Sequence, residues 1–151
     1  MIREARPDEA AALAAIQRDA SLAGYAHIFP PELYPYPTDV VAKRWEEFLA
    51  DDEMTVLVAE EDGAVRGFAS AAVVPFFHDG SRRLRLTAVA VAAPYRGRGI
   101  ARSLVGELER WARDRGCTLV EVTSAEHRSD AHAAYRALGF DETSRRFVRQ
   151  L

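Results

Sequence analysis

The sequence predicts an α/β fold in which helices cover both faces of a mixed β-sheet, within a single domain of residues 1–151. Segments typical of strands alternate along the chain with segments of helical periodicity. Glycine and proline separate these segments where turns are needed. A chain of 151 residues can bury a core, and no internal repeat, linker or low-complexity tract divides it.

The N-terminal region begins with a strand over residues 1–6, which Pro7 ends. Asp8 is the expected N-cap of a helix over residues 10–23. Gly24 is expected to end this helix. The first two elements are therefore a strand and a helix.

Residues 25–37 combine aromatic side chains with prolines at a density that excludes a regular helix. They form either a hydrophobic packing segment or a lid over a binding site. Thr38 is the expected cap of the next helix, whose Val41, Trp45 and Phe48 share one face.

Three strands follow without an intervening helix. Residues 54–60 and 64–74 flank Asp62-Gly63, a dipeptide typical of a tight hairpin turn. The side chains of residues 84–91 alternate in polarity well enough to predict the third strand.

The second half of the chain returns to helix and strand in alternation. Residues 100–115 carry the clearest helical stripe, residues 118–123 read as a buried strand, and residues 130–138 as a short helix. Residues 140–151 are expected to form one or two closing strands. The last of these could pair with the edge of a second subunit, which leaves a homodimer open.

Composition excludes several classes of protein. The formal net charge of −3 and pI of about 5.8 argue against a nucleic-acid partner, because phosphate contacts need a basic field. No apolar run approaches the roughly 20 residues of a membrane span, and residues 1–7 do not resemble a signal peptide. Cys117 is the only cysteine and no metal-ligand spacing appears, so we expect a cytoplasmic protein without a metal.

The loop between the strand at 84–91 and the helix at 100–115 carries the chemistry. A helix N-terminus offers unpaired N–H groups and about half a positive charge, which together bind phosphate. Gly97 and Gly99 allow positive φ and close approach of a ligand. Arginine adds charge-assisted hydrogen bonds. The loop therefore predicts a pyrophosphate cradle, and the spacing excludes a P-loop and a dinucleotide fingerprint.

Two stretches of this sequence resemble the GNAT superfamily of acyl-CoA-dependent N-acyltransferases. LTAVAVAAPYRGRGIARSL at residues 86–104 is similar to the cofactor-binding motif of that family. DAHAAYRALGF at residues 130–140 is similar to its tyrosine-to-Leu-Gly-Phe segment. The resemblance implies a mostly antiparallel sheet with a splayed parallel strand pair, and acetyl-CoA as the acyl donor. It identifies no acceptor.

The resemblance also implies roles for individual residues. Backbone groups of Val89 to Val91 would bind the pantetheine arm, and Tyr135 would protonate the leaving thiolate. The residues implied in cofactor binding are Val89, Ala90, Val91, Arg96, Gly97, Arg98, Gly99, Ile100, Ala101 and Arg102. The residues expected to line the acceptor cleft are Tyr25, Phe29, Tyr34 and His78.

Glu121 is the first candidate for a general base, because a charge inside an apolar strand is costly unless it is paired or functional. The alternative is a structural glutamate that faces solvent or pairs with an arginine. Lesser candidates for the base are His78, Glu126, His127 and His132.

The function expected from the resemblance is acetylation of a primary amine on a small molecule. Three alternatives remain open at this point: an enzyme that acetylates a protein N-terminus or lysine, a non-catalytic acyl-CoA-binding module, and a nucleotide-phosphate binder of another family. An enclosed aromatic cleft favours the small molecule, and an open groove favours a peptide.

Overall fold

The computed structural model describes residues 1–25, 38–124, 128–147, 149 and 151. The strands of these residues form one sheet in the order β1-β2-β3-β4-β5. Their bounds are β1 Ile2–Glu4, β2 Met54–Glu61, β3 Ala64–Pro75, β4 Arg82–Val91 and β5 Cys117–Val122. The helices are α1 Ala10–Tyr25, α2 Thr38–Leu49, α3 Ile100–Asp114 and α4 Ser129–Ala137, with 3₁₀ turns at Pro7–Glu9 (η1) and Ala93–Tyr95 (η2).

The sheet is antiparallel from β1 to β4, and β5 pairs with β4 in parallel. This mixed topology and the parallel pair confirm the fold class predicted from the sequence. The hairpin between β2 and β3 turns at Asp62 and Gly63, whose φ angles of 54° and 72° are both positive. Two central residues with positive φ are what a tight hairpin turn requires.

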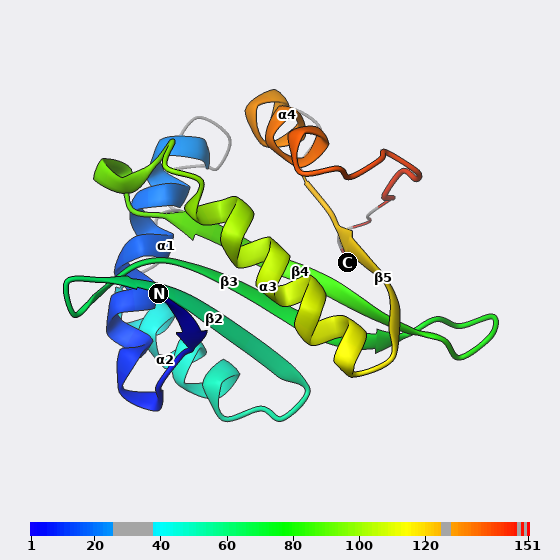
Figure 1. Ribbon diagram of the computed structural model, residues 1–151, viewed down its shortest axis with the longest axis horizontal. Helices are drawn as coiled ribbons and strands as arrows, with labels where there is room; N and C mark the ends of the chain where they lie inside the picture. The colour runs from blue at the N-terminus through cyan, green and yellow to red at the C-terminus, as the bar shows by residue number, and fades with distance from the viewer. Residues whose placement is uncertain (26–37, 125–127, 148, 150) are drawn as a thin grey trace.

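Helices cover the two faces of the sheet, as expected (Figure 1). On one face, Leu104 and Leu108 of α3 pack with Leu84 of β4 in a cluster that is almost fully buried. On the other face, Phe68 of β3 packs among α1 and α2, and its ring meets Trp45 edge to face at 4.8 Å between centroids. Large apolar side chains thus anchor both layers to the sheet.

The first helix begins at Ala10 as predicted, but its cap and its C-terminal end differ from the prediction. Asp8 is not an N-cap: it lies inside η1, and the carboxylate of Glu9 accepts the Arg6 N–H at 2.7 Å instead. The helix also continues through Gly24 to Tyr25. A glycine costs a helix about 1 kcal/mol and does not by itself stop it.

The closing strands expected over residues 140–151 are absent from the part of that segment that the structure describes. Residues 141–147 are exposed, and the Phe147 side chain is 90% exposed. A strand needs a neighbouring edge to satisfy its backbone groups, and these residues pair with none. The prediction of a final strand here is wrong for the described residues.

Candidate active site

The loop between β4 and α3 has the backbone that its glycines predicted. Gly97 and Gly99 have φ angles of 75° and 79°, a region that side chains rarely adopt. A Cβ atom built on either glycine meets nothing within 4 Å. The outer side of this loop is therefore open, and its backbone can be approached closely by a ligand.

The N-terminus of α3 faces the same opening. Its first helical hydrogen bond runs from the Ser103 N–H to the Gly99 carbonyl at 3.0 Å. The N–H groups of Ile100, Ala101 and Arg102 precede that bond and have no helical acceptor among the described residues. Together with the helix dipole they form a site that suits an anion such as pyrophosphate.

The three arginines of the loop each have a contact within the protein. Arg96 Nε donates to the Val91 carbonyl at 2.9 Å, and Arg102 Nη2 donates to the Ala137 carbonyl of α4 at 3.0 Å. Arg98 Nη1 lies 3.8 Å from Glu61 Oε1. These contacts hold the loop to its surroundings, so the backbone N–H groups remain as the direct anion ligands, within a positive field from the guanidinium groups.

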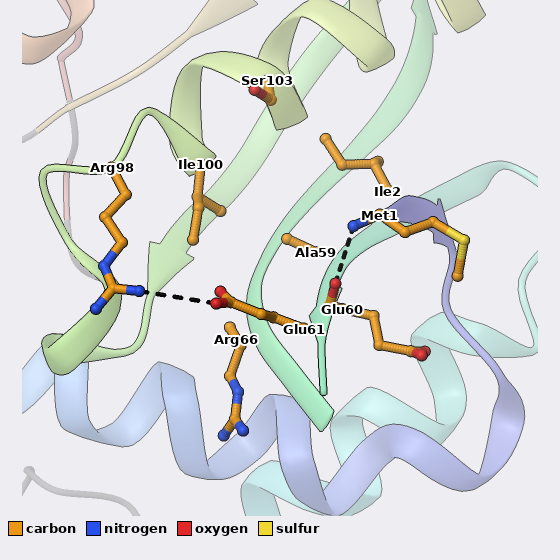
Figure 2. Close-up of a pocket in the computed structure, with 9 residues that line it drawn as sticks. All are labelled: Met1, Ile2, Ala59, Glu60, Glu61, Arg66, Arg98, Ile100 and Ser103. Carbon is orange, nitrogen blue, oxygen red and sulfur yellow. Dashed lines mark hydrogen bonds and ion pairs between the residues drawn. The ribbon is translucent and has the colours of Figure 1, made fainter. Parts of the chain in front are cut away.

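A pocket of about 290 Å³ lies beside the loop, between its Arg98 and the β1–β2 end of the sheet (Figure 2). Figure 2 shows Arg98 directed at Glu61, with Ile100 and Ser103 lining the same space. The order of the strands puts β1 and β2 on the opposite side of β4 from β5. This pocket is therefore separate from the side of α3 on which the parallel strand pair lies.

The parallel pair separates where the predicted pantetheine contacts begin. β4 and β5 are paired from Arg82 to Leu86, with a register shift after Arg82, whereas β4 continues to Val91. No described strand pairs with Val89, Ala90 or Val91 on the β5 side. Among the described residues, the backbone on this side of β4 has no strand partner here, and the Val91 carbonyl accepts Arg96.

A pair of hydroxyl groups marks the start of this separation. The register between β3 and β4 shifts after Ser70, and Thr87 is the additional residue. Ser70 Oγ and Thr87 Oγ1 are hydrogen-bonded at 2.7 Å. Neither residue was predicted as functional from the sequence. A serine and a threonine in the more apolar parts of the two strands were a usable signal.

Tyr135 lies at the end of α4, where the helix closes with two hydrogen bonds that define a Schellman motif. The Phe140 N–H donates to the Tyr135 carbonyl and the Gly139 N–H to the Arg136 carbonyl, both at 3.0 Å. The rings of Tyr135 and Phe140 meet edge to face at 5.7 Å. Both pack against the cluster under α3, so the tyrosine is held on the same flank as β5.

Glu121 is paired with arginine. Its Oε1 accepts hydrogen bonds from Arg85 Nε at 3.0 Å and Arg85 Nη2 at 2.8 Å. Its Oε2 lies 3.8 Å from Arg83 Nη1. Arg85 is also its cross-strand neighbour in the parallel pair. This geometry favours the alternative in which Glu121 pairs with an arginine.

The residues expected at the acceptor cleft are not brought together by the described part of the chain. Phe29 and Tyr34 lie outside the described residues, and so does the side chain of Tyr25. His78 lies in the hairpin between β3 and β4, at the opposite end of β4 from Val91, with its ring 5.0 Å from that of Phe76.

The remaining candidate bases are Glu126, His127 and His132. Glu126 and His127 lie outside the described residues. His132 is half-buried in the first turn of α4, and its N–H donates to the Arg128 carbonyl at 3.0 Å.

Comparison with known proteins agrees with this geometry. The sequence profile of the Acetyltransferase (GNAT) family matches residues 22–140. The Aminoglycoside N(6′)-acetyltransferase type 1 of Stenotrophomonas maltophilia is 31% identical over 148 residues, 95% of this chain and 88% of that protein. A protein of the same name from Salmonella typhimurium is 30% identical over 118 residues, 76% of this chain and 81% of that protein.

Solved structures share the fold. AAC(6′)-Iy in complex with the bisubstrate analogue CoA-S-monomethyl-acetylneamine aligns over 100% of this chain and 97% of its own, with a TM-score of 0.79 and 24% identity. A possible acetyltransferase from Clostridium difficile 630 aligns over 100% of this chain and 96% of its own, with a TM-score of 0.84 and 19% identity.

An open helix N-terminus beside a parallel strand pair that separates is an arrangement that suits an acyltransferase. The match to the family profile makes the assignment specific: this chain belongs to the GNAT family of acetyltransferases. It is an acyltransferase enzyme that acts on an amine. No helix among the described residues is long and apolar enough to cross a membrane.

Proposed function

We propose that this enzyme transfers the acetyl group of acetyl-CoA to a primary amine of a small molecule. The observation that carries the proposal is the open N-terminus of α3, next to the unpaired end of β4. The N–H groups of Ile100 to Arg102 suit the pyrophosphate, and the free backbone edge of Val89 to Val91 suits an extended pantetheine arm. Bound in this way, the donor brings its thioester to the separation of β4 and β5.

The reaction is direct attack of a neutral amine on the thioester carbonyl. A C–N bond forms, the C–S bond breaks, the amine loses a proton and the thiolate gains one. Tyr135 is the proposed general acid, because the family resemblance gives that role to this tyrosine and it packs on the β5 flank of α3. A thiol with a pKa of about 8.5 needs only a modest acid.

Removing the proton from the amine is the costly step. For an alkylamine with a pKa near 10.4, deprotonation at pH 7 costs about 4.6 kcal/mol of free energy. Glu121 is the candidate base from the sequence. Its Oε1 accepts two hydrogen bonds from Arg85, so Oε2, which lies 3.8 Å from Arg83 Nη1, is the oxygen that would take the proton. A water molecule between β4 and β5 is the other route for the proton.

The names of similar proteins suggest a class of acceptor for this enzyme. The proteins from Stenotrophomonas maltophilia and Salmonella typhimurium are named for N(6′)-acetylation of aminoglycosides. Small-molecule amines are therefore the first acceptors to test, and an aminoglycoside belongs in the panel.

A thermal-shift measurement tests donor binding first, with acetyl-CoA, CoA, ATP and NAD at about 1 mM each. A ligand at 100 times its Kd adds about 2.7 kcal/mol to the unfolding free energy. This corresponds to roughly 5–10 °C for a domain of this size. We expect a shift with the two CoA compounds only. Equal shifts with ATP, or none with acetyl-CoA, would contradict the proposal.

Transfer is then tested with amines and acetyl-CoA, by following the released thiol. Thiol release that depends on the amine supports an enzyme acting on small molecules. Release only with peptide substrates would instead support a protein acetyltransferase. Binding of acetyl-CoA without release for any amine or peptide would indicate an acyl-CoA-binding module.

A further inference from the structure

One polar strip lies on the sheet face opposite α3, on the first half of β4. Leu84 and Leu86 of β4 face α3 and are buried in its cluster. Side chains alternate along a strand, so Arg83 and Arg85 face the other way. Among the side chains that the structure describes, the core beneath α1 includes Ala88 and Ala90 of β4 but neither arginine. Among the described residues, no helix covers the two arginines.

The arginines of this strip share a single carboxylate. Glu121 Oε1 accepts both hydrogen bonds from Arg85, whereas Arg83 approaches Oε2 only to 3.8 Å. The Arg85 side chain is 53% exposed. Among the described residues, Glu121 is the only carboxylate within 4.0 Å of either guanidinium group, and Asp79 acts on Arg83 electrostatically without an ion pair. Two guanidinium groups thus share one direct carboxylate partner.

Arg83 is the less satisfied of the two arginines. Its guanidinium carbon lies 3.5 Å from the centroid of the Phe76 ring, which fixes the orientation of the group. Its Nε is buried and has no hydrogen-bond partner among the described residues. A buried cationic donor without an acceptor is costly, and this Nε adds to the positive potential of the strip. The donors that a ligand can reach are those of the more exposed Arg85 and the outer nitrogens of Arg83.

The strip leads to the point where β4 and β5 separate. Thr87 follows Arg85 on the same face of β4, and its hydroxyl is bonded to Ser70 at the register shift. Two residues of a strand span about 7 Å. A small molecule can therefore place its amine at the separation and a second group, a few bonds away, at Arg85 and Arg83.

From this arrangement we propose that the acceptor amine carries an oxyanion, a carboxylate or a phosphate, which binds Arg83 and Arg85. This inference rests on the proposed function and specifies its acceptor class. Guanidinium groups bind both oxyanions with charge-assisted hydrogen bonds. A polycationic aminoglycoside would instead bring ammonium groups next to two arginines, at a cost from like charges.

The test compares acceptors that differ only in this group. ε-Aminocaproate and its primary amide have the same length and shape, and only the first carries a carboxylate. Phosphoethanolamine and ethanolamine form the phosphate pair. A kanamycin-type aminoglycoside is the polycationic acceptor. For the wild-type enzyme we expect kcat/KM to be at least about 10-fold higher for an anionic acceptor than for its neutral partner.

Two substitutions assign the preference to the strip. In Arg83→Gln and in Arg85→Gln we expect the ratio of kcat/KM between anionic and neutral acceptors to fall by roughly 10-fold, mainly through KM. Arg113→Gln is the matched control, because Arg113 is an exposed arginine near the C-terminal end of α3 that pairs with Glu109 at 3.4 Å. It should keep the wild-type ratio. The thermal shift with acetyl-CoA verifies that each variant is folded.

The outcomes separate this inference from the proposed function. Acetylation of neutral amines or the aminoglycoside, with no preference for anionic acceptors, would overturn the inference and leave the proposed function intact. A preference that persists in both Arg83→Gln and Arg85→Gln would also overturn it. Failure of acetyl-CoA to bind, or of every acceptor to release thiol, would overturn the proposed function and this inference with it.

Discussion

At the scale of single residues, the end of α4 explains why Tyr135 is held firmly. Gly139 adopts a φ of 93°, and the chain then folds back so that Phe140 contacts Tyr135. In a Schellman motif these two positions are the ones that make the hydrophobic contact. The Tyr-Arg-Ala-Leu-Gly-Phe segment thus has a packing role as well as a candidate catalytic role. A substitution that removes only the hydroxyl of Tyr135 tests the catalytic role and keeps the packing.

Tyr135→Phe should reduce kcat by about 10²-fold, the lower end of the range for general acids, because the leaving thiolate is a weak base. The ring and its contact with Phe140 are kept, so the thermal shift with acetyl-CoA should not change. Tyr95→Phe is the matched control, since it also removes one hydroxyl while the contacts of the ring with Arg66 and Arg98 remain. Equal rates for Tyr135→Phe and the wild type would exclude the acid role.

Glu121→Gln distinguishes a base from a partner of Arg85. Because Glu121 accepts two hydrogen bonds from Arg85, we expect a loss of less than about 10-fold in kcat, below what removal of a general base costs. The pH profile of kcat/KM should keep its acidic limb. A larger loss together with disappearance of that limb would instead establish Glu121 as the base.

At the scale of elements, the proposed binding site at the junction of β4 with α3 depends on backbone conformation and backbone N–H groups more than on side chains. Gly99 has the left-handed conformation and precedes the first residue of α3. The N–H groups that follow it have no helical acceptor among the described residues, and the surrounding space is open at both glycines. A methyl group at Gly99 would therefore strain the turn and enter the space proposed for the pyrophosphate.

Gly99→Ala should lower the unfolding free energy by about 1 kcal/mol, since an L-residue pays this cost in the left-handed region, and should weaken acetyl-CoA binding. Gly106→Ala is the matched control within α3, where a Cβ also meets nothing within 4 Å. It should stabilise the protein by roughly 0.5–1 kcal/mol and leave binding unchanged. Denaturant unfolding and calorimetric titration measure the two effects. Equal binding by both variants would contradict the cradle.

Local patterns predicted most of these elements, and long-range contacts account for the rest. The Asp62-Gly63 turn, the stripe of α3 and the positive φ at Gly97 depend on neighbours in sequence, and the structure confirms them. The bond from Arg102 to Ala137 joins residues 35 positions apart. Periodicity contains no information about such a partner.

The same limit explains the predictions that failed. Asp8 is not the cap, because the carboxylate of the adjacent Glu9 accepts the Arg6 N–H instead. The sequence alone does not indicate which of two neighbouring acidic residues makes this hydrogen bond. The closing strand required an edge to pair with, and the described residues of 141–147 do not reach one. The positive φ angles of the loop before α3 were predictable from its glycines, whereas the shared carboxylate of Arg83 and Arg85 depends on the register of β4 with β5.

At the scale of the whole molecule, β5 is the last strand of the sheet, next to a segment whose Phe147 is exposed. An exposed edge and an exposed aromatic side chain do not establish a dimer, so the homodimer remains a prediction. The opposite edge is secured differently: the guanidinium of Arg3 in β1 binds the carboxylates of Glu9 and Glu60, which joins the first strand to η1 and β2. This cluster is well shielded, with only 7% of the Glu9 side chain exposed.

The cluster should make the fold sensitive to acid. The hydrogen bond from Arg3 is the main cause that lowers the pKa of Glu9 below its ordinary value, and burial opposes it. A carboxyl group with a lowered pKa stabilises the fold above its unfolded pKa of about 4.3, and the contribution is lost as pH falls through the folded pKa.

Glu9→Gln should therefore lower the free energy of unfolding by about 1–3 kcal/mol at pH 7, where the wild-type pair is fully charged. The variant should also show a weaker loss of stability between roughly pH 5 and pH 3. Glu142→Gln removes an ion pair with Arg136 whose two side chains are 77% and 60% exposed, so it should change stability by less than about 0.5 kcal/mol. Urea unfolding across this pH range measures both variants, and parallel curves for Glu9→Gln and the wild type would show that another group carries the acid response.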